Sequence, residues 1–184
     1  MQHRQSVSHA DPKLEIIDAR QRIRIRFEDG GVTLTPAGRP STRWVWSVRL
    51  VGVGGVASSL WLETQRPVVA RGRLEYRHPG VTEWILNEPE GMEHGFDVLE
   101  PIDSEASEVE LRLALGGSLL PSVGPDGRGL SLRDPHGRIL LHYDGLQAFD
   151  RTGRQLAASM ALDRAQLLRI RVDVAGAFYP VVVN

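Results

Sequence analysis

The hydrophobic and polar residues of this chain alternate one by one in several segments, which is typical of β-strands with one buried face. In the first of these segments, Ile23, Ile25 and Phe27 alternate with charged residues. The same pattern recurs at 44–50, 108–115 and 168–174. Strands with one apolar and one polar face indicate antiparallel sheets, because strands of parallel sheets are usually buried on both faces.

Turn sequences separate these segments at the short spacing of an all-β domain. Residues 134–138 and 150–154 share the form Asp-x-x-Gly-Arg, which suits a type I turn with Asp first and Gly fourth. We therefore predict an all-β fold, an antiparallel β-sandwich of roughly twelve strands. The expected strands are 23–28, 31–35, 44–52, 57–62, 67–77, 81–87, 94–99, 107–115, 129–133, 138–143, 155–162 and 166–183 with a break.

Two segments have a mixed pattern. Residues 156–162 contain good helix formers but also alternate, and we interpret them as a strand. Residues 11–21 have the start signal of a short helix, with Asp11 as N-cap and Pro12 at the first helical position. We predict a flexible N-terminal segment at 1–13 and a single β-sandwich domain at 14–184.

The composition is that of a globular domain, with 184 residues, 41% of them hydrophobic and 24% charged. The formal net charge of -1 gives no reason to expect nucleic acid or an anionic membrane surface as a partner. No apolar segment has the length needed to cross a bilayer. The chain has no cysteine, which excludes disulfides and thiolate metal sites. Its histidines do not have a metal-ligand spacing, and we predict no metal ligands among them.

Acidic residues are concentrated between 83 and 110, where ten occur without a single Lys or Arg. One interpretation is a solvated face with a polar loop at 101–105. The alternative is a weak calcium site, because calcium prefers several carboxylate oxygens together.

Two patterns suggest chemistry, but we favour a structural interpretation of both. Residues 52–57 satisfy the dinucleotide-binding pattern G-x-G-x-x-G/A, yet no helix is expected to follow, so we predict a glycine-rich bend and no cofactor. A catalytic pair drawn from Glu83, Glu88 and Glu93 would need a defined separation across a cleft, which sequence cannot supply. No serine lies in a nucleophile elbow. We predict no catalytic residues.

The densest mixture of polar and aromatic residues lies at 82–96. We expect Trp84 and Phe96 to lie in the core, with Asn87 and Gly91 shaping the turn between two paired strands. Trp44 and Trp46 share one face of their strand and are also expected to pack inward, although exposed tryptophans could instead stack on sugars.

The order of four segments resembles a known family. Residues 18–34, 82–96 (with Thr82-Glu-Trp-Ile-Leu-Asn and Gly91-Met-Glu-His-Gly-Phe), 140–150 and 169–183 (with Tyr179-Pro) are similar to the N-terminal module of large secreted or surface-attached bacterial proteins that continue into FG-GAP or related β-propeller repeats. The family usually has Tyr where this chain has Ile85, and Gln where it has His94. The likeness spans roughly residues 14–184.

This resemblance implies a context and no particular chemistry. It implies a non-catalytic extracellular or surface domain, excised from a longer chain, that acts as a cap, spacer or protein-interaction module beside a repeat region; the domain would be cytoplasmic if Met1 is the native start. The partner would be a neighbouring domain or a surface protein. The alternative is a carbohydrate-binding module that uses exposed tryptophans. Possible ligand or interface residues are Trp84, Asn87, Glu93, His94 and Tyr179.

Overall fold

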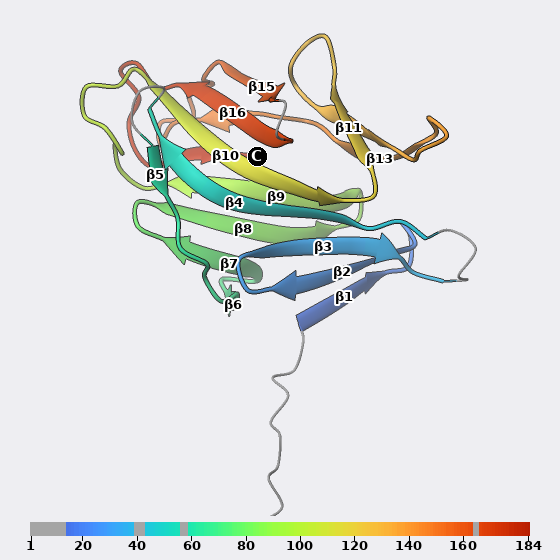
Figure 1. Cartoon of the computed structure of the whole chain (residues 1–184). Coiled ribbons are helices and arrows are strands. Elements are labelled where there is room, and N and C mark those ends of the chain that lie inside the picture. The colour runs from blue at the N-terminus through green and yellow to red at the C-terminus, as the bar shows by residue number, and fades with distance from the viewer. Residues whose placement is uncertain (1–13, 39–42, 56–58, 164–165) are drawn as a thin grey trace, which may run out of the picture.

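Three antiparallel sheets make up the computed structural model, which describes residues 14–38, 43–55, 59–163 and 166–184 (Figure 1). Sheet A has the order β1 (Leu14–Asp18), β2 (Ile23–Glu28), β3 (Gly31–Pro36), β4 (Trp46–Gly54), β10 (Glu108–Gly117), β16 (Leu167–Asp173) and β15 (Ala158–Leu162), and β5 (Ser59–Trp61) pairs with β4. Sheet B has the order β14 (Ala148–Phe149), β17 (Val181–Val183), β9 (Gly91–Val98), β8 (Val81–Glu88), β7 (Arg73–His78) and β6 (Val68–Ala70). Sheet C consists of β11 (Leu120–Val123), β12 (Leu130–Arg133) and β13 (Ile139–Tyr143).

Apolar and polar side chains alternate along the strands, and the apolar ones form the core between sheets A and B. On β2, Ile23, Ile25 and Phe27 are buried, while Arg24 and Arg26 point to the other face. Buried apolar side chains from both sheets belong to one hydrophobic cluster. The predicted all-β antiparallel sandwich is therefore confirmed.

Tyr76 joins the two large sheets through a polar contact inside this core. Its side chain is fully buried on β7 of sheet B, and its hydroxyl lies 2.7 Å from the carbonyl oxygen of Gly31, to which it donates, and 3.0 Å from that of Glu28. Both carbonyls belong to the hairpin of β2 and β3 in sheet A. Burial raises the pKa of Tyr76, with a smaller contribution from the charge of Glu83, so the hydroxyl stays protonated and can donate.

Several expected elements differ from the observed ones. The helix predicted at 11–21 is wrong for the described part, because residues 14–18 pair with β2 and the Asp18 carboxylate then caps a turn by accepting the backbone N–H of Gln21 at 2.9 Å. The predicted strand 67–77 is interrupted at Arg71 and Gly72, whose φ angles of 53° and 78° suit a tight hairpin turn. Strands β1, β11 and β14 were not predicted.

Two further expectations fall partly outside the described residues. The predicted flexible segment 1–13 lies outside them. The predicted glycine-rich bend at 52–57 is only partly described. β4 continues as a strand through Gly54, but its pairing with β10 shifts register between Leu50 and Gly52. The ambiguous segment 156–162 contains strand β15, which confirms the interpretation as a strand.

Both Asp-x-x-Gly-Arg sequences form the predicted turns. The Gly137 N–H donates to the Asp134 carbonyl at 2.9 Å, and the Gly153 N–H donates to the Asp150 carbonyl at 2.9 Å. The Asp134 carboxylate accepts the backbone N–H of Arg138, as that of Asp150 accepts the N–H of Arg154. The two Asp-x-x-Gly-Arg sequences thus form the same kind of turn.

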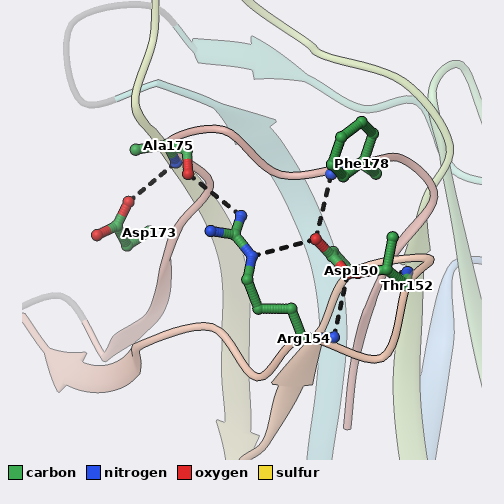
Figure 2. Close-up of polar contacts among 6 residues, drawn as sticks. All are labelled: Asp150, Thr152, Arg154, Asp173, Ala175 and Phe178. Atoms are coloured by element: carbon green, nitrogen blue, oxygen red, sulfur yellow. Dashed lines mark hydrogen bonds and ion pairs between the residues drawn. The ribbon is translucent and has the colours of Figure 1, made fainter.

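The second turn also holds the segment that leads into β17 (Figure 2). The Asp150 carboxylate accepts the hydroxyl and N–H of Thr152 and, at 3.4 Å, the N–H of Phe178. Arg154 donates to this carboxylate at 3.2 Å and to the carbonyl of Ala175 at 3.2 Å. The hydrogen bonds from Thr152 lower the pKa of Asp150, so the carboxylate is ionised at neutral pH.

Candidate functional site: a cleft between the sheets

An open cavity of about 540 Å³ lies where sheets A and B meet sheet C; we call it the inter-sheet cleft. All three sheets contribute residues to its wall. The buried residues of this wall, which we call the floor, include Ile23, Leu34, Trp46, Phe96, Met160 and Ile170. The more exposed residues, which we call the mouth, include Gln21, Glu90, Glu93, Asp144, Gln147 and Asn184. The cleft therefore has an apolar interior and a polar rim.

A line of polar side chains runs from the cleft wall into the core across three neighbouring strands of sheet B. Glu83 on β8 is fully buried, and its Oε1 lies 2.8 Å from Nε2 of His94 on β9. Its Oε2 lies 4.0 Å from Nε2 of His78 on β7 and has no hydrogen-bond partner among the described residues. Nδ1 of His94 lies 3.1 Å from the hydroxyl of Tyr143 on β13. Tyr143 thus joins sheet C to sheet B at the cleft.

Burial determines the protonation of the two ends of this line. It raises the pKa of Tyr143, and the nearby charge of Glu83 adds to the effect. It lowers the pKa of His78, and Glu83 offsets part of this decrease. At neutral pH Tyr143 keeps its proton and His78 is uncharged. The Tyr143 hydroxyl can then donate to Nδ1 of His94, which leaves Nε2–H to donate to Glu83.

Aromatic rings form much of the floor on the side of Tyr143. The centroids of Trp46 and Tyr143 lie 5.7 Å apart, and those of His94 and Phe96 lie 4.7 Å apart. The Nε1–H of Trp46 is buried and has no hydrogen-bond partner among the described residues. These contacts pack the aromatic side chains of the wall against one another.

The structure brings together two of the five candidate ligand or interface residues. Glu93 and His94 both line the inter-sheet cleft. Asn87 is exposed and pairs with Met92 inside the hairpin of β8 and β9, so its expected place in the turn is wrong. Tyr179 is half-buried and is not among the described residues that line the cleft.

Trp84 is buried, as expected, but it lies on the outer face of sheet B and outside the main hydrophobic cluster. Its Nε1–H donates to Oδ1 of Asp97 at 2.9 Å, and the guanidinium of Arg73 lies 5.0 Å from the ring centroid. The reason is strand alternation, because Trp84 directly follows Glu83, whose side chain points inward. Phe96, which points inward on β9, lies in the core as expected.

The tryptophans do not form the platform that sugar stacking requires. Trp61 is 64% exposed, whereas Trp46 and Trp84 are 2% and 5% exposed, and Trp44 is partly buried against the core. One exposed indole does not make the row of at least two that the carbohydrate-binding alternative needs. Nothing in the arrangement of the four tryptophans therefore favours this alternative.

The acidic residues of 83–110 are dispersed rather than gathered. Glu110 is held by Arg112 and Arg171 at 2.6 and 2.8 Å, and Asp97 by Arg73 at 2.5 Å. No group of three His, Cys, Asp or Glu side chains that could hold a metal occurs in the described part of the chain. Of the three carboxylates considered for catalysis, Glu93 lines the cleft, Glu83 lies in the core and Glu88 is exposed elsewhere on β8.

The sequence analysis missed Tyr143 and the partnership of Glu83 with His94. A signal for the second was present, because Glu83 alternates in phase with Val81 and Ile85, which are inward-facing apolar residues. A carboxylate at such a position requires a buried partner. No comparable signal marks Tyr143, whose contact depends on how sheet C packs against sheet B.

Comparisons with known proteins give no match: no protein-family model, curated protein or solved structure is similar to this chain. The likeness to the module that precedes FG-GAP repeats therefore stays a prediction from sequence. Among the described residues there is no helix that could cross a membrane.

Proposed function

We propose that this domain binds a small, mainly apolar organic molecule in the inter-sheet cleft. The observation that carries the proposal is the cleft itself, with a volume of about 540 Å³ and a floor of buried apolar and aromatic side chains. Pockets that hold small molecules usually have volumes of roughly 300 to 1,000 Å³, are lined mainly by apolar residues and are largely preformed. The volume of the inter-sheet cleft lies in this range, and the floor of the cleft is apolar.

Binding of 1-N-phenylnaphthylamine tests the proposal, because this uncharged probe becomes fluorescent in apolar surroundings. We expect a saturable signal with one probe bound per chain. A variant with Met92→Trp and Leu141→Trp places two larger side chains in the cleft wall and should lose most of the signal.

The matched control carries Val69→Trp and Leu99→Trp, at positions that are 71% and 49% exposed and do not line the cleft. Circular dichroism establishes that both variants are folded. We expect the control to bind the probe as the unaltered protein does. Equal binding by the two variants would show that the probe does not occupy the cleft and would refute the proposal.

The role of a cap, spacer or protein-interaction module, in an extracellular setting and without catalysis, stays a prediction. A neighbouring domain that docks at the last strand needs an exposed apolar patch there. Instead, β17 is paired on both sides, by β14 and β9, and Val181 and Val183 are fully buried. Phe178, which precedes this strand, is 57% exposed. The last strand thus offers no free edge for a neighbouring domain.

A further inference from the structure

The mouth of the inter-sheet cleft has a one-sided distribution of charge. Glu90, Glu93 and Asp144 line it, and none of the described residues that line it is Arg or Lys. The whole chain is nearly balanced, with 22 basic and 23 acidic residues, so this excess of carboxylates is local. A concave surface lined by charges of one sign concentrates ligands of the opposite sign.

The carboxylates of the mouth also differ from other acidic side chains in their partners. Glu75 and Glu110 are each held by two arginines. Glu93 instead accepts a hydrogen bond of 2.6 Å from the uncharged amide of Asn184, and Asp144 lies 3.9 Å from Nδ1 of His142. The negative charge of Glu93 is therefore not neutralised by this partner.

The floor below this mouth contains aromatic rings beside its aliphatic side chains. Trp46 and Phe96 belong to it, and Tyr143, which is half-buried, lies in the adjoining wall with its hydroxyl held by His94. The faces of aromatic rings carry partial negative charge and attract cations, most strongly in the case of tryptophan. The floor and the mouth thus favour the same kind of ligand for independent reasons.

We propose that the ligand of the inter-sheet cleft is a small organic cation, an ammonium group on an apolar body. This inference rests on the proposed function and adds the charge of the ligand to it. The apolar body lies against the floor, and the ammonium group lies among the carboxylates of the mouth. An anion of the same shape meets repulsion at the mouth.

Three ligands of nearly equal shape test the charge of the ligand. They are benzyltrimethylammonium, its uncharged carbon analogue neopentylbenzene, and the anion phenylmethanesulfonate, each used to displace 1-N-phenylnaphthylamine. At low ionic strength we expect the cation to bind about tenfold more tightly than the uncharged analogue, and the anion most weakly. The preference should decrease in 0.5 M salt, because charges at an exposed mouth are screened.

A variant with an uncharged mouth identifies the source of the preference. It combines Glu90→Gln, Glu93→Gln and Asp144→Asn. The control removes as many charges from exposed positions that do not line the cleft, with Glu63→Gln, Glu100→Gln and Glu105→Gln. We expect the mouth variant to lose about threefold or more of the preference for the cation, and the control to keep it.

The outcomes separate this inference from the proposed function. If the uncharged probe binds in the cleft but the three ligands displace it equally well, the cleft is a binding site and the inference of a cation is wrong. An equal loss of preference in both triple variants would also overturn the inference, because it would show an effect of net charge alone. If the probe does not bind in the cleft, the proposed function itself fails.

Discussion

Replacing Gly95 by alanine tests how the outer face of sheet B is packed. Gly95 on β9 lies directly opposite Trp84 on β8. A Cβ atom at Gly95 would lie 2.6 Å from Cη2 of the indole and still closer to Cζ2 and Cε2. Because carbon atoms pack at about 3.5 to 4.0 Å, the indole would have to move by roughly 1 Å or more. The position therefore requires glycine as long as Trp84 lies across it.

The expected cost follows from the contacts that the indole would lose. Overpacking of this kind usually costs about 1 to 3 kcal/mol. Loss of the hydrogen bond to the Asp97 carboxylate would add about 1.5 kcal/mol to this cost, and loss of the contact with Arg73 would add about 0.5 kcal/mol. Alanine regains about 0.5 kcal/mol over glycine inside a strand. We expect Gly95→Ala to lower the free energy of unfolding by about 2.5 to 4.5 kcal/mol.

A double-mutant cycle measured by denaturant unfolding separates this cause from others. In the background of Trp84→Ala the clash is absent, and Gly95→Ala should then be neutral or stabilise the protein by about 0.5 kcal/mol. A neutral effect of Gly95→Ala in the unaltered protein would refute the reasoning. So would an equal cost in both backgrounds, because the strain would then lie in the backbone of β9.

Three further changes test contacts that hold the fold together. Tyr76→Phe removes the hydroxyl that donates to the buried carbonyl of Gly31, and chemical denaturation should show a loss of about 1 to 3 kcal/mol. Asp150→Ala should lower the midpoint of thermal unfolding more than Asp134→Ala, because Asp150 also binds the N–H of Phe178; equal shifts would contradict this. For Glu110, burial acts to raise the pKa, but hydrogen bonds from Arg171 and Arg112 outweigh it and lower the pKa below 4.5. The ionised Glu110 carboxylate thus stabilises the fold above about pH 4.5, and this contribution is lost as the pH falls through the lowered pKa. Glu110→Gln should therefore make the free energy of unfolding depend less on pH on the acid side, as measured by urea unfolding between pH 3 and 6.

Much of the fold could be predicted from alternation, and the segments where prediction failed have physical reasons. Segment 156–162 could be predicted as a strand because its apolar residues alternate with others. In the structure Met160 lies opposite Ile170, and both are buried. Residues 14–18 were mistaken for part of a helix because an N-cap signal precedes them. Pairing with β2 overrides that local preference.

The candidate site could be predicted only in part, since its residues come from three sheets. Alternation gives the face of the sheet on which each side chain lies, and it is sufficient to place Glu83 and His94 inward on neighbouring strands. Alternation does not show which faces of different sheets contact one another. Tyr143 is 49 residues from His94 and reaches it only because sheet C lies beside sheet B at the cleft. Buried polar groups need hydrogen-bond partners, so an inward-facing carboxylate in an alternating strand indicates that a buried partner exists. The sequence does not identify partners from another sheet, because these depend on how the sheets pack against one another.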